Sequence, residues 1–138
     1  MDIRKLSDDY SVSPQITPAD AKSIAQAGFK TVICNRPNGE NPPFLHMPEI
    51  KAAVEACGLA FYDNPFDPST FGPDKIEKQK ALLSQAEKPV LAYCASGNRC
   101  SIVWAFSQAG VMDTDDIIAR VEKAGYQAAH MRPALDAN

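Results

Sequence analysis

The chain has 138 residues, of which 45% are hydrophobic and 22% charged, and its formal net charge is −3. These values are typical of one soluble globular domain, and we expect residues 1–138 to fold as such a unit. The acidic balance argues against nucleic acid or an anionic membrane as a partner, and no apolar stretch reaches the ~18 residues of a membrane helix. The first residues lack the apolar core of a signal peptide, so we expect a cytoplasmic protein.

The predicted elements alternate between strand and helix along the chain. Tyr10-Ser11-Val12-Ser13 alternates apolar and polar residues and predicts a short edge strand. Apolar runs predict further strands over residues 30–35, 59–62 and 89–93, and helical spacing or capping residues predict helices over 17–28, 47–57, 73–87, 102–106 and 113–124, with a short final segment at 130–135. This alternation predicts an α/β fold with a mostly parallel sheet covered on both faces.

Three loops are expected to meet at one edge of this sheet. Residues 35–37, 65–72 and 94–99 each follow a predicted strand. In parallel sheets ligands bind at the carboxyl ends of the strands, so these loops predict a shared binding crevice.

Cys94 and Arg99 are the principal candidates for chemistry in that crevice. Cys94 ends a predicted buried strand and precedes a helix, where unpaired backbone N–H groups and the positive end of the helix dipole stabilise a thiolate. Arg99 adds a planar guanidinium suited to an oxyanion. The pattern predicts a sulfur nucleophile beneath an anion-binding loop.

The residues between these two are small or polar and leave room for an anion. Ala95 and Gly97 carry no bulky side chain, and Gly97 can adopt the positive φ that a tight curl requires. Ser96 and Asn98 are candidates to donate hydrogen bonds to the anion, although each could equally stabilise the loop.

Two further charged residues fall at the mouth of the predicted crevice. Asp67 is a candidate general acid for a phosphoryl or sulfuryl transfer, and the alternative is a turn-forming Asp before Pro68. Arg36 is a candidate second anion contact, with a surface salt bridge as the alternative.

Four cysteines, at positions 34, 57, 94 and 100, are too few and too irregularly spaced for a disulfide scaffold. Cys34 and Cys100 could each resolve an oxidised or persulfidated Cys94, and both could instead be small core residues. Cys57 is expected to be a packing residue. There is no CxxC pair and the histidines are isolated, so we expect no metal and no cofactor.

Several short motifs follow one another in order: Ser11-Val12-Ser13-Pro14-Gln15-Ile16, Asn35-Arg36-Pro37 with Gly39-Glu40, residues 93–99, Trp104-Ala105, Ala124-Gly125-Tyr126 and Arg132-Pro133. With these motifs the chain resembles the bacterial protein-tyrosine-phosphatase-like family called DUF442, or the phosphatase-like domain of beta-lactamase-hydrolase-like proteins. Members of that family are often labelled sulfur transferases. The resemblance implies a cysteine-phosphatase-like three-layer fold with a central sheet of four or five strands.

The resemblance leaves the reaction open. Cysteine phosphatases typically carry C-x5-R, whereas this chain has C-x4-R, which is similar to the loop of rhodanese-type sulfurtransferases. Ala95 also replaces an arginine that often follows the cysteine in the family. The shorter loop favours first a sulfurtransferase that carries sulfane sulfur as a Cys94 persulfide and passes it to a thiol acceptor. The missing arginine removes a charge that would favour thiosulfate, and so it favours a less charged sulfur donor.

The alternative is a phosphatase that forms a phosphocysteine and uses Asp67 as its acid. A redox-sensing or anion-binding module is a third hypothesis. The sequence does not identify the sulfur donor, the acceptor or a phosphorylated substrate. It also does not determine the oligomeric state.

Overall fold

The computed structural model describes residues 1–137 and shows one five-stranded sheet in this range, in the order β1-β2-β5-β3-β4. The strands are β1 (Arg4–Ser7), β2 (Tyr10–Ser13), β3 (Thr31–Cys34), β4 (Ala60–Asp63) and β5 (Val90–Tyr93). Strands β2, β5, β3 and β4 are parallel, and β1 runs antiparallel to β2. The predicted α/β fold with a mostly parallel sheet is confirmed.

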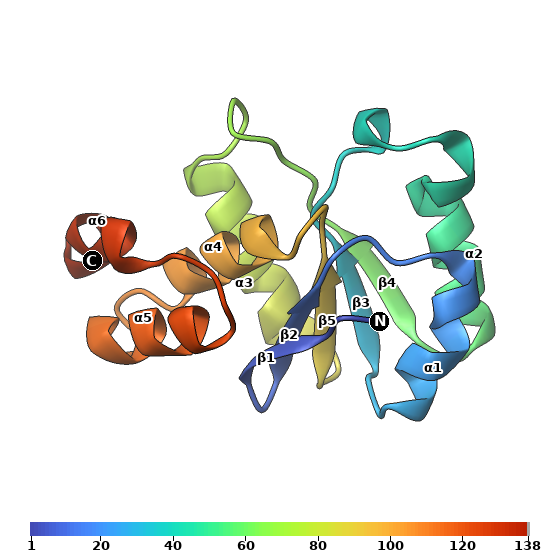
Figure 1. Ribbon diagram of the computed structural model, residues 1–138, viewed down its shortest axis with the longest axis horizontal. Coiled ribbons are helices and arrows are strands. Elements are labelled where there is room, and N and C mark those ends of the chain that lie inside the picture. The colour runs from blue at the N-terminus through green and yellow to red at the C-terminus, as the bar shows by residue number, and fades with distance from the viewer. Residues whose placement is uncertain (138) are drawn as a thin grey trace.

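Helices cover both faces of the sheet (Figure 1). The helices are α1 (Ala21–Gln26), α2 (Met47–Ala56), α3 (Pro73–Gln85), α4 (Asn98–Ser107), α5 (Thr114–Lys123) and α6 (Arg132–Asp136), and short 3-10 turns occur at Pro18–Asp20, Asn38–Glu40, Pro43–Leu45 and Ala129–Met131. In Figure 1, α1 and α2 lie on one side of the sheet and α3 to α6 on the other. The chain thus forms the predicted three layers.

Each face of the sheet has its own apolar core. Under α1 and α2 the core includes Ile24, Val32 and Ile50. On the opposite face, Trp104 of α4 is 2% exposed and stacks on Tyr10 with the ring centroids 6.0 Å apart. Burial of such side chains is the main stabilising contribution to the fold.

The four parallel strands end at the same level. Strand β5 ends at Tyr93, which pairs with Ser13 on one side and with Cys34 on the other, and Cys34 in turn pairs with Asp63. The loops that follow these strands therefore share one edge of the sheet, as predicted for the crevice.

Two expectations about individual residues are wrong. Strand β2 is not an edge strand, because β1 pairs along its outer side and all four β2 residues are buried. In β1 only Leu6 is buried, so its sequence carries no clear strand pattern. Cys57 is exposed rather than packed, and it is the C-cap residue that follows α2. Within residues 1–137, no helix is long and apolar enough to cross a membrane.

Candidate active site

Cys94 lies at the bottom of a tight loop between β5 and α4. Gly97 is the N-cap residue of α4 and adopts the left-handed conformation, with φ at 92°. The Gly97 N–H donates to Cys94 Sγ at 3.1 Å. Cys94 is only 1% exposed, so its sulfur is largely removed from bulk water.

The loop strongly favours the ionised form of Cys94. A hydrogen bond from the Cys100 thiol, assisted by the backbone N–H groups of Cys100, Ser96 and Gly97, lowers the pKa of Cys94 to about 5, despite burial, which acts in the opposite direction. At neutral pH the sulfur is therefore a thiolate, which is the reactive form of cysteine.

Arg99 is held so that one edge of its guanidinium stays available. Its Nη1 donates to Glu40 Oε2 at 2.9 Å and to the Phe66 carbonyl at 3.0 Å, and its Nη2 donates to Glu40 Oε1 at 2.7 Å. Of the five N–H donors of an arginine, these bonds use three. The remaining two are Nε–H and the second Nη2–H, which lie on one side and suit two oxygens of a single anion.

Glu40 is the residue that fixes this geometry, and its contacts were not predicted from the sequence. Its carboxylate accepts from Arg99 through both oxygens and from Arg36 Nε at 3.1 Å. These hydrogen bonds hold the pKa of Glu40 below its usual range, and the bond from Arg99 makes the largest contribution. The signal that could have identified Glu40 is its place in the Asn35-Arg36-Pro37 and Gly39-Glu40 motif.

Arg36 lies on the predicted side of the sheet but is bound within its own loop. Its Nε and Nη2 donate to the Glu40 side chain and carbonyl, and its Nη1 donates to Gln15 Oε1 at 3.3 Å. The salt bridge that was weighed as the alternative is therefore present. Any contact of Arg36 with an anion remains a prediction.

Asp67 forms the turn that was weighed against a catalytic role. Its Oδ1 accepts from Ser69 N–H at 2.8 Å, from the Ser69 hydroxyl at 2.6 Å and from Thr70 N–H at 3.0 Å. These hydrogen bonds lower the pKa of Asp67, and the bond from the Ser69 hydroxyl makes the largest contribution. Asp67 nevertheless adjoins Phe66, whose carbonyl binds Arg99, so its loop borders the site.

The rim of the loop is exposed and polar, with a tyrosine packed against it. Ala95, Ser96 and Asn98 are exposed, and the Ser96 hydroxyl accepts from the Asn98 N–H at 3.2 Å. The Tyr126 hydroxyl donates to the Ser96 carbonyl at 2.9 Å. A Cβ at Gly97 would collide with that hydroxyl, so both the space and the positive φ require glycine.

Of the two proposed resolving thiols, Cys100 is the one in contact with Cys94. The Cys100 thiol is fully buried, which raises its pKa well above the ordinary value and keeps it protonated as a hydrogen-bond donor. Cys34 belongs to the core on the opposite face of the sheet, and its Sγ donates to the Arg36 carbonyl at 3.2 Å. All four cysteines are free.

A buried polar network ties the loops around the site together. Asn35 and Asn64 directly follow β3 and β4, and both donate to Gln79 Oε1 of α3 at 3.0 Å. The Tyr10 hydroxyl accepts from Gln79 Nε2 at 3.3 Å and donates to the Cys100 carbonyl at 2.9 Å. The network joins the residues that follow β3 and β4 to α3 and α4, so it links the Arg36 and Asp67 loops to α4.

Solved structures share this fold. A candidate phosphatase from Neisseria meningitidis is 41% identical, with a TM-score of 0.86 over 99% of this chain and 98% of that chain. Tk-PTP in its active form has a TM-score of 0.75 at 14% identity, over 99% of this chain and 94% of that chain. The fold is that of the protein-tyrosine-phosphatase-like proteins, and the Cys94 thiolate between β5 and α4 makes the site that of a cysteine-dependent, phosphatase-like enzyme.

The family is identified by sequence as well. Residues 2–111 match the model of the beta-lactamase hydrolase-like protein, phosphatase-like domain, and the chain belongs to this family. A beta-lactamase hydrolase-like protein from Agrobacterium fabrum is 28% identical over 105 residues, which are 76% of this chain. The match spans only 24% of that relative's length.

Proposed function

We propose that this protein is a phosphomonoester hydrolase that acts through a phosphocysteine at Cys94. The observation that carries the proposal is the pairing of a buried thiolate with the free edge of Arg99. Family membership and the 41% identical candidate phosphatase support hydrolysis of phosphate esters over sulfur transfer.

In the first step the Cys94 thiolate attacks phosphorus, an S–P bond forms and the P–O bond to the leaving group breaks. Arg99 Nε–H and Nη2–H bind two non-bridging oxygens, and the N–H groups of the loop face the same phosphoryl group. Because the pKa of Cys94 is about 5, the thiolate is present at neutral pH without a separate base.

In the second step water attacks phosphorus and the S–P bond breaks. Inorganic phosphate and the free thiolate are released, so the enzyme returns to its starting state. The hydrogen bonds from Cys100 and the loop amides that stabilise the thiolate also make the sulfur a good leaving group in this step.

We propose that Asp67 supplies the proton to the leaving oxygen. Its carboxyl is ionised at neutral pH in the turn, so this role requires protonation and exchange of the bonds to Ser69 and Thr70. Asp67→Asn should lower kcat strongly for an alkyl phosphate and little for p-nitrophenyl phosphate, whose leaving group needs no acid. Equal losses for the two substrates would remove Asp67 from this step.

The direct test of the proposal is phosphate release by the reduced protein from a panel of phosphomonoesters. Wild type should turn over, and Cys94→Ser should lose at least about a thousandfold in kcat, because the hydroxyl of serine is not ionised at this pH. Cys57→Ser is the matched control, since Cys57 is exposed and outside the site. Activity that survives in Cys94→Ser would refute a phosphocysteine.

Sulfur transfer is the second candidate, and the C-x4-R spacing favours it. A shorter loop forms a tighter ring of N–H donors, which suits a persulfide sulfur on Cys94 better than a tetrahedral phosphate. In this reaction Cys94 takes sulfane sulfur from a donor and passes it to a thiol acceptor. Asp67→Asn should then leave the rate unchanged.

We also propose Cys100 as the thiol that resolves an oxidised Cys94. A hydroperoxide would convert the Cys94 thiolate to a sulfenic acid, and attack by the Cys100 sulfur would form a disulfide and release water. Peptide mapping after mild peroxide should show Cys94 linked to Cys100, because these two sulfurs are in contact. A link from Cys94 to Cys34 would contradict this assignment.

A further inference from the structure

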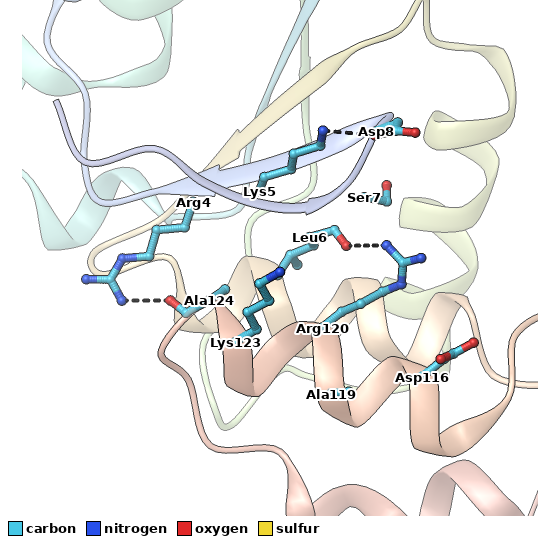
Figure 2. A pocket seen from close by; sticks show the side chains of 10 residues that line it. All are labelled: Arg4, Lys5, Leu6, Ser7, Asp8, Asp116, Ala119, Arg120, Lys123 and Ala124. Carbon is cyan, nitrogen blue, oxygen red and sulfur yellow. Dashed lines mark hydrogen bonds and ion pairs between the residues drawn. The ribbon is translucent and has the colours of Figure 1, made fainter.

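A groove of about 690 Å³ lies between the edge strand β1 and helix α5, apart from the Cys94 loop (Figure 2). Leu6 of β1 and Ala119 of α5 form its apolar part. The remaining lining is mostly charged and consists of Arg4, Lys5, Asp8, Asp116, Arg120 and Lys123, with Ser7 and Ala124.

Positive charge predominates in this groove although the chain as a whole is acidic. Four cations face two carboxylates along its walls, whereas the chain carries a net charge of −3. Within residues 1–137, neither Arg120 nor Lys123 forms an ion pair. Lys123 and the part of the Arg120 guanidinium that does not bind the Leu6 carbonyl thus remain available to an anionic ligand.

The cations on the strand wall already bind carboxylates of the same chain. Arg4 contacts Asp2 at 3.0 Å, and Lys5 contacts Asp8 at 2.8 Å. Both carboxylates are largely exposed, and exposed ion pairs contribute little to stability. A carboxylate from another molecule could replace them at low cost.

The groove is elongated because its two walls run alongside each other. Arg4 Nη1 donates to the Ala124 carbonyl and Arg120 Nη1 to the Leu6 carbonyl, both at 3.0 Å, so β1 and α5 run side by side in opposite directions. Arg4 and Leu6 are two strand residues apart, which is roughly 6.6 Å, and positions 120 and 124 are about 6 Å apart on the helix. Alternate side chains of an extended peptide repeat at the same distance.

We propose that this groove binds an extended acidic peptide segment of a partner protein, with acidic residues at alternate positions. Figure 2 shows Arg4, Arg120 and Lys123 between β1 and α5, with Lys5 turned toward Asp8 on the other side of β1. Cations placed along an elongated groove suit a row of carboxylates better than one compact anion. The Leu6 carbonyl is occupied by Arg120, so ion pairs carry the contact instead of an added strand. The proposal is independent of the reaction at Cys94.

The test is fluorescence anisotropy of a labelled, end-blocked peptide of alternating Glu and Thr, measured with the full chain at low ionic strength. The wild type should bind it and should not bind the matching Gln and Thr peptide. Lys123→Glu should weaken binding about tenfold, because it removes one attraction and adds one repulsion. Inorganic phosphate at a concentration that saturates the Cys94 site should leave binding unchanged when the ionic strength is held constant with NaCl, because salt alone screens ion pairs.

Lys51→Glu is the matched control. Lys51 is exposed on α2, which lies at the opposite side of the molecule from α5 in Figure 1, and the substitution changes the net charge equally. The affinity of the Lys51→Glu variant for the peptide should equal that of the wild type. Equal weakening by Lys51→Glu and Lys123→Glu would overturn the proposal, as would displacement of the peptide by phosphate. Tighter binding of tripolyphosphate than of the peptide would identify a small-polyanion site instead.

Discussion

Removal of the Cys100 thiol should make Cys94 a weaker acid. Hydrogen bonds from Cys100 and the loop amides lower the pKa of Cys94 to about 5, so roughly 99% of the sulfur is ionised at pH 7. A hydrogen bond to a charged group contributes about 1.5–3 kcal/mol, and one pKa unit equals about 1.36 kcal/mol. Cys100→Ala, which removes the first of these bonds, should therefore raise the pKa of Cys94 by about one to two units.

The assay is the rate of Cys94 alkylation by iodoacetamide as a function of pH, with the modified peptide identified by mass spectrometry. Because the thiolate reacts, the midpoint of the rate profile reports the pKa of Cys94. Cys100→Ser is the matched control, since its hydroxyl can still donate and should keep the midpoint near that of the wild type. An unchanged midpoint in Cys100→Ala would refute the role assigned to the Cys100 thiol.

Two other substitutions test how the loop is held. Glu40→Gln should lower kcat/KM for phosphate esters about ten- to hundredfold, because Arg99 loses the carboxylate that orients its guanidinium. Steady-state kinetics measures this loss. An unchanged kcat/KM would mean that other contacts fix Arg99. Gly97→Ala should lower the free energy of unfolding by about 1–2 kcal/mol or more, since its φ is positive and the added Cβ meets Tyr126. Thermal unfolding of Gly97→Ala with and without Tyr126→Phe separates the cost of the positive φ from the cost of the collision with the Tyr126 hydroxyl. An unaltered Tm in Gly97→Ala alone would contradict both costs.

The fold was largely predictable because β3 and β5 are strongly apolar and several helices have a proline at their first or second position. Strand β5 and helix α3 illustrate this, since the former is fully buried and the latter begins at Pro73 as expected. Strand β1 could not be predicted from its pattern because Leu6 alone is buried. That missing strand also explains why β2 was expected at the edge of the sheet.

The candidate site was predictable where one short segment carries it. Cys94 precedes a short loop and Arg99 lies in the first turn of α4 just after it, so local spacing was sufficient to predict them as a pair. Glu40 and Tyr126 reach the loop from distant parts of the sequence, and such pairings arise only from tertiary packing. The preference for sulfur transfer rested on one loop count, whereas the family match favours the phosphatase hypothesis.

The most direct test of the central claim is the covalent state of Cys94 during turnover. The reduced protein is mixed with a phosphomonoester, quenched rapidly in acid and examined by intact mass spectrometry, with Cys94→Ser in parallel. Our account predicts a gain of one phosphoryl group on the wild type, mapped to Cys94 and absent from the variant. A protein that gains no phosphoryl group but takes up one sulfur atom at Cys94 from a persulfide donor would contradict it.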